Sequence, residues 1–158
     1  MLRASEILGI PVLVTTQSAS KLGPTCHELS LEHALAVVDK TAFSMYVPGI
    51  RTHLPPPPAE IVIVGIETHI CVTQTTLDLL VAGYHVYVLA DGVSSCNAPE
   101  VGIALRRLAR EGAVVTTSES FLYEVMGDAS IADFRQIAAL VKDTKASTKA
   151  SLEGLSKM

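Results

Sequence analysis

Short apolar runs alternate along this chain with longer stretches in which apolar positions recur every three or four residues. Each run is five or six residues long and is bounded by polar residues, Gly or Pro. Continuous apolar runs of this length are typical of parallel strands that are buried on both faces. The pattern therefore predicts five strands, at residues 11–16, 34–38, 60–65, 85–90 and 113–117.

The stretches between these runs predict helices. Apolar positions at helical spacing cover residues 2–8, 68–82, 98–111 and 130–142. Thr68 and Asn97 are the predicted N-caps of two of these helices, and Ser130 with Asp133 forms a capping-box pattern at the start of the last. Strands that alternate with helices predict an α/β fold, a three-layer α/β/α sandwich around a mostly parallel, Rossmann-like sheet.

The predicted strands and helices all lie within residues 1–142, which indicates a single domain. Residues 143–158 are polar and repetitive, so we predict a flexible C-terminal tail. The final residues, Ser156, Lys157 and Met158, resemble a peroxisomal targeting tripeptide. Because the chain does not open on a signal peptide, we expect a cytoplasmic location, with the peroxisome as the alternative.

Composition excludes several classes of protein. Hydrophobic residues make up 49% of the chain and charged residues 18%, which excludes intrinsic disorder. The apolar runs are too short to span a membrane. Twelve Lys and Arg residues against sixteen Asp and Glu residues give a net charge of −4, and no basic stripe is present. Without Trp and with 4% aromatic residues, the chain also lacks a base-stacking platform, so we expect no nucleic acid partner.

Cys71 is the first candidate for chemistry. It follows the third predicted strand and falls in the first turn of the helix that Thr68 would cap. Ligands of parallel α/β sheets bind beyond the carboxyl ends of the strands. A helix start favours a thiolate, and free backbone amides there could hold an oxyanion. The alternative is a buried, inert cysteine that packs the first turn, and the spacing alone does not favour either reading.

Three further polar residues lie at predicted strand ends or helix starts. Lys40 follows the second strand, where it could hold a thiolate or polarise a substrate; the alternative is a solvated lysine paired with Asp39. His69 is a candidate substrate contact. Gln17 follows the first strand and either lines the pocket or only ends the strand. These positions predict a small-molecule substrate site at one edge of the sheet.

The sequence predicts no cofactor and no metal. Neither a G-x-G-x-x-G nor a G-x-x-x-x-G-K-[ST] motif occurs. The pairs Cys26 with His27 and His69 with Cys71 lack zinc-type spacing. With Cys96, the cysteines number three, too few for a disulfide framework.

Several motifs resemble those of the isochorismatase-like, or cysteine-hydrolase, superfamily, and most of all the eukaryotic isochorismatase domain-containing proteins. They follow the family's order from about residue 1 to residue 142. The block at 65–83 beside the one at 39–45 is specific to the family. The matching segments are VLVTTQ (12–17), KLGPT (21–25), DKTAFSM (39–45), GIETHICVTQTTLDLLVAG (65–83), ADGVSS (90–95), VTTSES (115–120) and VMGDA (125–129).

The resemblance implies a six-stranded, mostly parallel sheet and a homo-oligomer. It implies that Cys71 is the nucleophile and that Lys40 stabilises its thiolate. A cis peptide is implied between Ile66 and Glu67, with the amides of Glu67 and Cys71 as the oxyanion hole. Gln17, Thr68 and His69 would contact the substrate. Relatives that resemble nicotinamidases bind a metal through Asp and His residues, which residues 17–23 do not offer.

The family's general base is an Asp on its first strand, which lies in the middle of the sheet. This sequence begins after that motif, so we expect a truncated version of a longer protein. The resemblance thus predicts a hydrolase that forms a Cys thioester from a small amide or related carbonyl compound, impaired here by loss of the Asp. Relatives that hydrolyse isochorismate lack the Cys, so isochorismate is not inferred. The alternatives are an inactive, oligomeric binding or regulatory protein and, less favoured, a redox sensor at Cys71.

Overall fold

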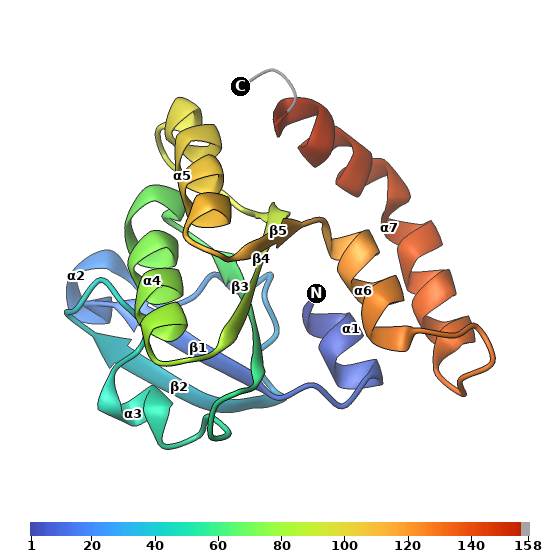
Figure 1. Ribbon diagram of the computed structural model, residues 1–158, viewed down its shortest axis with the longest axis horizontal. Helices are drawn as coiled ribbons and strands as arrows, with labels where there is room; N and C mark the ends of the chain where they lie inside the picture. Colours follow the sequence, from blue (N-terminus) through green and yellow to red (C-terminus); the bar gives the residue numbers. More distant parts are fainter. Residues whose placement is uncertain (156–158) are drawn as a thin grey trace.

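Five parallel strands with helices on both sides make up the computed structural model, which describes residues 1–155 (Figure 1). The strands are β1 (Val12–Gln17), β2 (Ala34–Lys40), β3 (Glu60–Gly65), β4 (His85–Val93) and β5 (Val114–Thr116). All five coincide with predicted strands. The α/β fold expected from the alternating pattern is therefore confirmed, because each short apolar run forms a strand.

The strands form two separate sheets in the described part of the chain. β1 pairs with β2, and their carboxyl ends meet with Gln17 opposite Lys40. β3, β4 and β5 form the second sheet in that order. Within residues 1–155, one edge of β1 and one edge of β3 therefore have no strand partner. Every β1 residue is half-buried, and Val64 of β3 is 42% exposed, whereas a strand enclosed in a sheet would be more covered.

Helices cover the sheets in two layers (Figure 1). α4 and α5 pack against β4 on one side, while α6 and α7 contact β4 on the other and α1 packs on α7. Two single-turn helices, α2 and α3, lie beside the β1–β2 sheet. The helices are α1 (Leu2–Ile7), α2 (Ala19–Leu22), α3 (Pro48–Arg51), the π-helix η1 (Thr68–Val72), α4 (Thr73–Val81), α5 (Ala98–Arg110), α6 (Ser118–Met126) and α7 (Phe134–Leu155).

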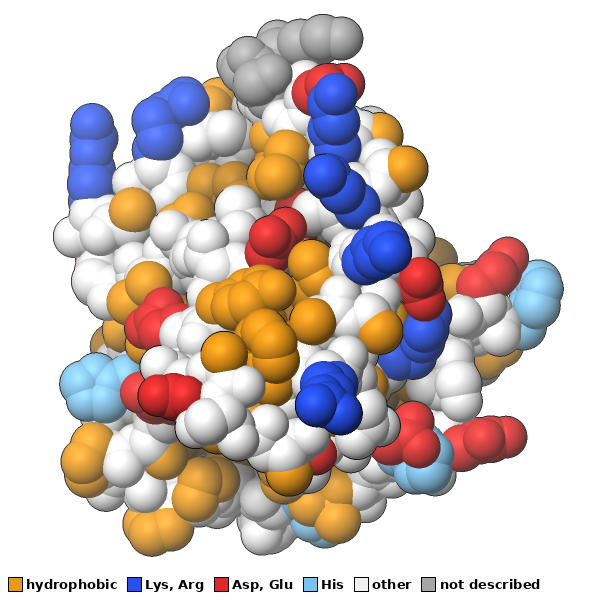
Figure 2. Space-filling model, turned by 90° about the vertical axis from the view of Figure 1, so that its right-hand side faces the viewer, with side chains coloured by type: hydrophobic (Ala, Val, Ile, Leu, Met, Phe, Trp, Pro, Cys, Tyr) orange, Lys and Arg blue, Asp and Glu red, His pale blue; other side chains and the backbone are white. Residues whose placement is uncertain are grey.

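Two clusters of buried side chains hold these layers together. The larger lies between the β3–β4–β5 sheet and helices α4 and α5, and it includes Val86, Val88 and Leu108, each at most 1% exposed. The smaller joins α1, α6 and α7 around Ala4 and Ile137. Figure 2 looks onto the side of these three helices and shows hydrophobic side chains gathered near its centre. α1 is also linked to the loop before β2.

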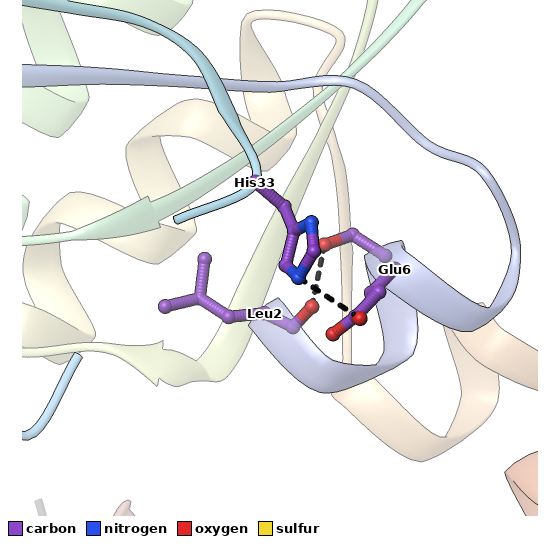
Figure 3. Close-up of polar contacts among 4 residues, drawn as sticks. Leu2, Glu6 and His33 are labelled. Atoms are coloured by element: carbon purple, nitrogen blue, oxygen red, sulfur yellow. Dashed lines mark hydrogen bonds and ion pairs between the residues drawn. The ribbon is translucent and has the colours of Figure 1, made fainter. Parts of the chain in front are cut away.

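That link is an exposed ion pair between His33 Nε2 and Glu6 Oε1, 2.9 Å apart (Figure 3). On the same helix the Ser5 hydroxyl donates to the Leu2 carbonyl. Exposed pairs of this kind contribute about 0.2–1 kcal/mol at most. The pair therefore orients the loop more than it stabilises the fold.

Several predicted helix boundaries are wrong. The segment with Ser130 and Asp133 forms turns, and α7 begins only at Phe134 because Asp128 accepts the Ser130 amide. α7 then continues through Leu155, so helix covers most of the segment predicted as a flexible tail. The three final residues of the suggested targeting signal lie outside the described residues. α2, α3 and α6 were not predicted.

The predicted N-caps also differ from the structure. Asn97 does precede α5, but its side chain makes no capping hydrogen bond. Thr68 is not a cap: it is the first residue of η1, and Glu67 stands before it. Thr68 is fully buried, and its hydroxyl donates to the Ser94 carbonyl instead of accepting an amide of the first helical turn.

Candidate functional site

The turn between β3 and η1 brings the predicted site residues to the carboxyl edge of the larger sheet. β3 ends at Gly65, whose φ of +121° is a conformation that glycine adopts without steric cost. The peptide bond between Ile66 and Glu67 is cis, where the family resemblance places one. The wide first turn of η1 then carries the half-buried Cys71.

The loop between β4 and α5 holds this turn through its backbone. The Thr68 amide donates to the Ser94 carbonyl at 2.9 Å, and the Thr68 hydroxyl donates to the same oxygen at 2.8 Å. In the other direction, the Ser94 amide donates to the Gly65 carbonyl at 3.2 Å. These bonds satisfy polar groups that the end of β3 and the start of η1 would otherwise leave unpaired.

Residues 95 and 96 of the loop between β4 and α5 make further polar contacts with the turn between β3 and η1. The Ser95 hydroxyl accepts the Thr68 amide at 3.1 Å and lies 3.0 Å from Nδ1 of His69. The Glu67 carboxylate accepts the Cys96 amide at 2.7 Å. A hydrogen bond to this carboxylate, with its negative charge, raises the pKa of the exposed Cys96 thiol. Cys96 is therefore kept protonated at neutral pH and is a weak competitor for an electrophile.

A second cluster surrounds Lys40 at the carboxyl end of the smaller sheet. The Lys40 side chain is 7% exposed. Its Nζ donates to Oε1 of Gln17 at 2.6 Å, to the Ala42 carbonyl at 2.9 Å and to the Phe43 carbonyl at 3.1 Å. Gln17 in turn donates from Nε2 to the Thr41 carbonyl. A buried ammonium must be hydrogen-bonded, and these oxygens meet that need.

Thr75 of α4 connects the two clusters. Its hydroxyl donates to the Cys71 carbonyl at 2.6 Å and accepts the Met45 amide at 2.8 Å. The segment after Lys40 is thereby attached to the helix that follows Cys71. Within residues 1–155, however, no hydrogen bond or ion pair joins Lys40 directly to Cys71. The structure brings Gln17 together with Lys40, but not with Cys71.

The carboxylates nearest these strand ends have other partners. Asp39 accepts the Ala19 amide and the Thr16 hydroxyl, and these hydrogen bonds lower its pKa. Asp91 accepts both the amide and the hydroxyl of Ser118 at the start of α6. Within residues 1–155, the hydrogen bonds of Asp39 and Asp91 are to these groups and not to Cys71.

A cavity of about 500 Å³ lies beyond the ends of β3 and β4, beside the last turn of α7. Gly65, Ile66 and Asp91 form one part of its lining, and Ser151 and Leu155 of α7 another. Gln17, Thr68 and His69, which we predicted as pocket residues, do not line it. The helix that extends beyond its predicted end therefore contributes to a hollow beside the cis peptide.

Among residues 1–155, no three His, Cys, Asp or Glu side chains are grouped so that they could hold a metal ion. The described helices also include none that is long and apolar enough to span a bilayer. The absence of a metal and of a cofactor from the site remains a prediction.

Comparison with known proteins decides the family. The model of the isochorismatase domain matches residues 1–120, about three quarters of the chain. The chain belongs to the isochorismatase domain family. A secreted isochorismatase effector, Isc1, of Phytophthora sojae is 43% identical over 150 residues, with 90% of this chain and 71% of that protein covered. Isochorismatase domain-containing protein 1 of Salmo salar is 42% identical over 144 residues.

Solved structures show the same fold. The MAR1 ribonuclease of Caenorhabditis elegans has a TM-score of 0.83 and 36% identity, over 89% of this chain and 73% of that one. The YcaC gene product of Escherichia coli, an octameric hydrolase of unknown specificity, has a TM-score of 0.78 at 18% identity, over 98% and 78%. This chain spans only 51% of the Salmo salar protein, so the activity of the full-length relatives is not transferred to it.

Proposed function

We propose that this member of the isochorismatase domain family is a cysteine hydrolase that acts on a small amide or related carbonyl compound. The observation that carries the proposal is the place of Cys71, half-buried on the first turn that follows the carboxyl end of β3. A fully exposed cysteine would be open to solvent on every side, and a fully buried one would be inert. Cys71 is neither.

The proposed reaction has two steps. The Cys71 thiolate attacks the carbonyl carbon, a C–S bond forms, and the amine leaves with the electron pair of the C–N bond and a proton. Water then hydrolyses the thioester and releases the acid. The amides of Glu67 and Cys71 would stabilise the oxyanion, and Lys40 would stabilise the thiolate. In the structure Lys40 donates to Gln17, so this role requires Lys40 to exchange that partner.

We further propose that the reaction is slow in this chain. The family's base Asp belongs to a strand in the middle of the sheet, and within residues 1–155 one edge of β1 and one edge of β3 have no strand partner. No carboxylate of these residues hydrogen-bonds to Cys71. Loss of one member of a catalytic triad lowers the rate by about 10⁴-fold. Measurements should therefore follow single turnovers.

Alkylation by iodoacetamide at neutral pH tests the nucleophile. Mass spectrometry of the three cysteine peptides should show Cys71 reacting faster than Cys26 and Cys96. Lys40→Met should slow Cys71 alone, whereas the matched control Lys21→Met, on the exposed α2, should change nothing. Circular dichroism would confirm that both variants fold. Equal labelling of the three cysteines in the folded protein contradicts the proposal.

A second candidate is an inactive, oligomeric binding or regulatory protein. Two observations favour it: every Lys40 donor is already used, and β2 exposes Leu35 and Val37, at 55% and 53%, on one face. Apolar exposure of this kind is typical of interfaces. In this case Leu35→Glu should dissociate an oligomer seen by sedimentation, and Cys71→Ala should leave it intact. A monomer at all concentrations rules the second candidate out.

The ribonuclease in the name of one structural relative does not change this proposal. A net charge of −4 does not favour a polyanionic substrate. A small substrate remains the better match to a half-buried cysteine beside a strand end. Localisation of the protein by microscopy and cell fractionation would distinguish the expected cytoplasmic location from secretion, which the name of one relative gives for that relative.

A further inference from the structure

Ser95 holds two groups of the candidate site with one hydroxyl. Its Oγ lies 3.1 Å from the Thr68 amide nitrogen and 3.0 Å from Nδ1 of His69. Within residues 1–155, these are the polar contacts of Oγ, and Nε2 of His69 has no hydrogen-bond partner. Both side chains are half-buried.

The two neutral tautomers of His69 differ in which hydrogen is left without a partner. The Thr68 amide can only donate, so Ser95 Oγ accepts from it. If Nδ1 carried the imidazole proton, Oγ would accept twice, and its own proton would have no acceptor among the described residues. If Nδ1 is unprotonated, the Ser95 hydroxyl accepts one hydrogen and donates its own to Nδ1, and the hydrogen left without a partner is the one on Nε2, at the other edge of the half-buried ring.

The second arrangement also orders the dipoles. The amide donates to a hydroxyl that donates to a ring nitrogen, and hydrogen bonds in such a chain strengthen one another. The Thr68 amide is itself fixed by the Ser94 carbonyl at 2.9 Å, so the position of Oγ is set by backbone. Ser95 therefore meets His69 in a fixed place rather than as a mobile surface hydroxyl.

We propose that Ser95 is a positioning residue that holds His69 in the tautomer protonated at Nε2. His69 then offers a hydrogen-bond donor, not an acceptor, two residues before Cys71. The consequence for the substrate rests on the proposed function: the carbonyl compound that acylates Cys71 carries a second acceptor, a carbonyl or carboxylate oxygen, for Nε2–H.

Nitrogen NMR of the full chain tests the tautomer without any assay of activity. The ¹⁵N shifts of Nδ1 and Nε2 of His69 distinguish the two forms at a pH where the ring is neutral. We expect the wild-type ring to be protonated at Nε2. Ser95→Ala should shift the tautomer ratio toward Nδ1–H by about fivefold, the factor for loss of one ordinary hydrogen bond.

Two further variants distinguish the effect of the Ser95 hydroxyl from the general effect of substituting a serine. Ser95→Thr keeps a hydroxyl and should restore the wild-type ratio. Ser20→Ala removes a hydroxyl from the exposed α2 and should leave the ratio unchanged. A wild-type ring protonated at Nδ1 would overturn the inference, and so would a ratio that Ser95→Ala does not change.

A matched pair of activated esters tests the substrate class. In each, the Cys71 thiolate attacks the ester carbonyl, a C–S bond forms, and 4-nitrophenolate leaves with the pair of the C–O bond. 4-Nitrophenyl 4-oxopentanoate has a second carbonyl where 4-nitrophenyl pentanoate has a methylene. Relative to free N-acetylcysteine, we expect the protein to prefer the oxo ester about fivefold, and Ser95→Ala to lose the preference.

The NMR measurement of the tautomer and the acylation by the two esters test different parts of the proposal. No acylation of Cys71 by either ester, with the expected tautomer in NMR, contradicts the proposed hydrolase but supports the role of Ser95. Acylation of Cys71 without a preference between the esters supports the hydrolase and contradicts the proposed substrate class.

Discussion

Two adjacent threonines on α4 give a sharp test of the polar contacts behind the site. Thr75 and Thr76 are 2% and 0% exposed. The Thr75 hydroxyl donates to the Cys71 carbonyl and accepts the Met45 amide, whereas the Thr76 hydroxyl has no partner within residues 1–155. The same substitution, Thr to Val, should therefore have opposite effects at neighbouring positions.

The magnitudes follow from the hydrogen bonds. Thr75→Val removes two bonds of about 1 kcal/mol each and leaves the Met45 amide unpaired, so we expect a loss of about 2 kcal/mol in the free energy of unfolding. Thr76→Val replaces a buried, unpaired hydroxyl by a methyl group of similar size. Burying such a hydroxyl costs about 1–3 kcal/mol, so this variant should gain about 1 kcal/mol.

Urea unfolding followed by circular dichroism measures both values, with unchanged m values as the check that only stability has changed. For a domain of this size the melting temperature changes by about 2–4 °C for each kcal/mol. The two variants should thus melt about 6–12 °C apart. Equal stability of the two variants, or a Thr76→Val protein less stable than the wild type, would refute the reasoning.

Three further predictions concern single side chains. Glu67→Gln should speed alkylation of Cys96 at mildly alkaline pH, because the carboxylate raises the thiol's pKa; an unchanged rate contradicts this. Bonds from the Ala19 amide and a hydroxyl lower the pKa of Asp39, so its contribution to stability is complete above the unfolded value of 3.8 and is lost as pH falls through the lower folded value. Urea midpoints of Asp39→Asn and wild type should therefore converge in acid. Leu108→Ala should cost about 2–5 kcal/mol in urea unfolding, since Leu108 is fully buried, and a cost below about 1 kcal/mol would show that the core collapses around it.

The strands could be predicted because each depends on a short apolar run that is independent of its neighbours. The largest error at a strand end is in β4, which we predicted to end at residue 90 and which continues to Val93, where Gly65 pairs with Val93 after an irregularity in the ladder. The missed helices depend on tertiary contacts instead. α6 is nine residues long and is held by Phe121 and Leu122 in the core. Its one local sequence signal is the N-cap Thr117, whose side chain accepts the Ser120 amide.

The site was predictable to the extent that parallel strands bring their carboxyl ends together. That rule placed Gln17 and Lys40 at the same edge of the sheet, and the structure joins them by a hydrogen bond. The roles of Ser95 and of Thr75 depend on loops that approach η1 in space from distant parts of the chain. The sequence marked residues 90–95 only as a segment that matches the family, and no spacing rule relates Ser95 to His69.

The division of the strands into two sheets should give the two sheets different rates of amide hydrogen exchange. β4 is paired on both sides, with Val88 and Leu89 fully covered, so its amides should exchange hydrogen with solvent only when the whole sheet unfolds. β1 is paired on one side within residues 1–155 and is half-buried throughout. A local fluctuation is enough to expose the backbone amides of β1 to water at this edge. Amide hydrogen exchange should therefore be slow in the β3–β4–β5 sheet and fast in the β1–β2 sheet, and Lys40 lies in the β1–β2 sheet.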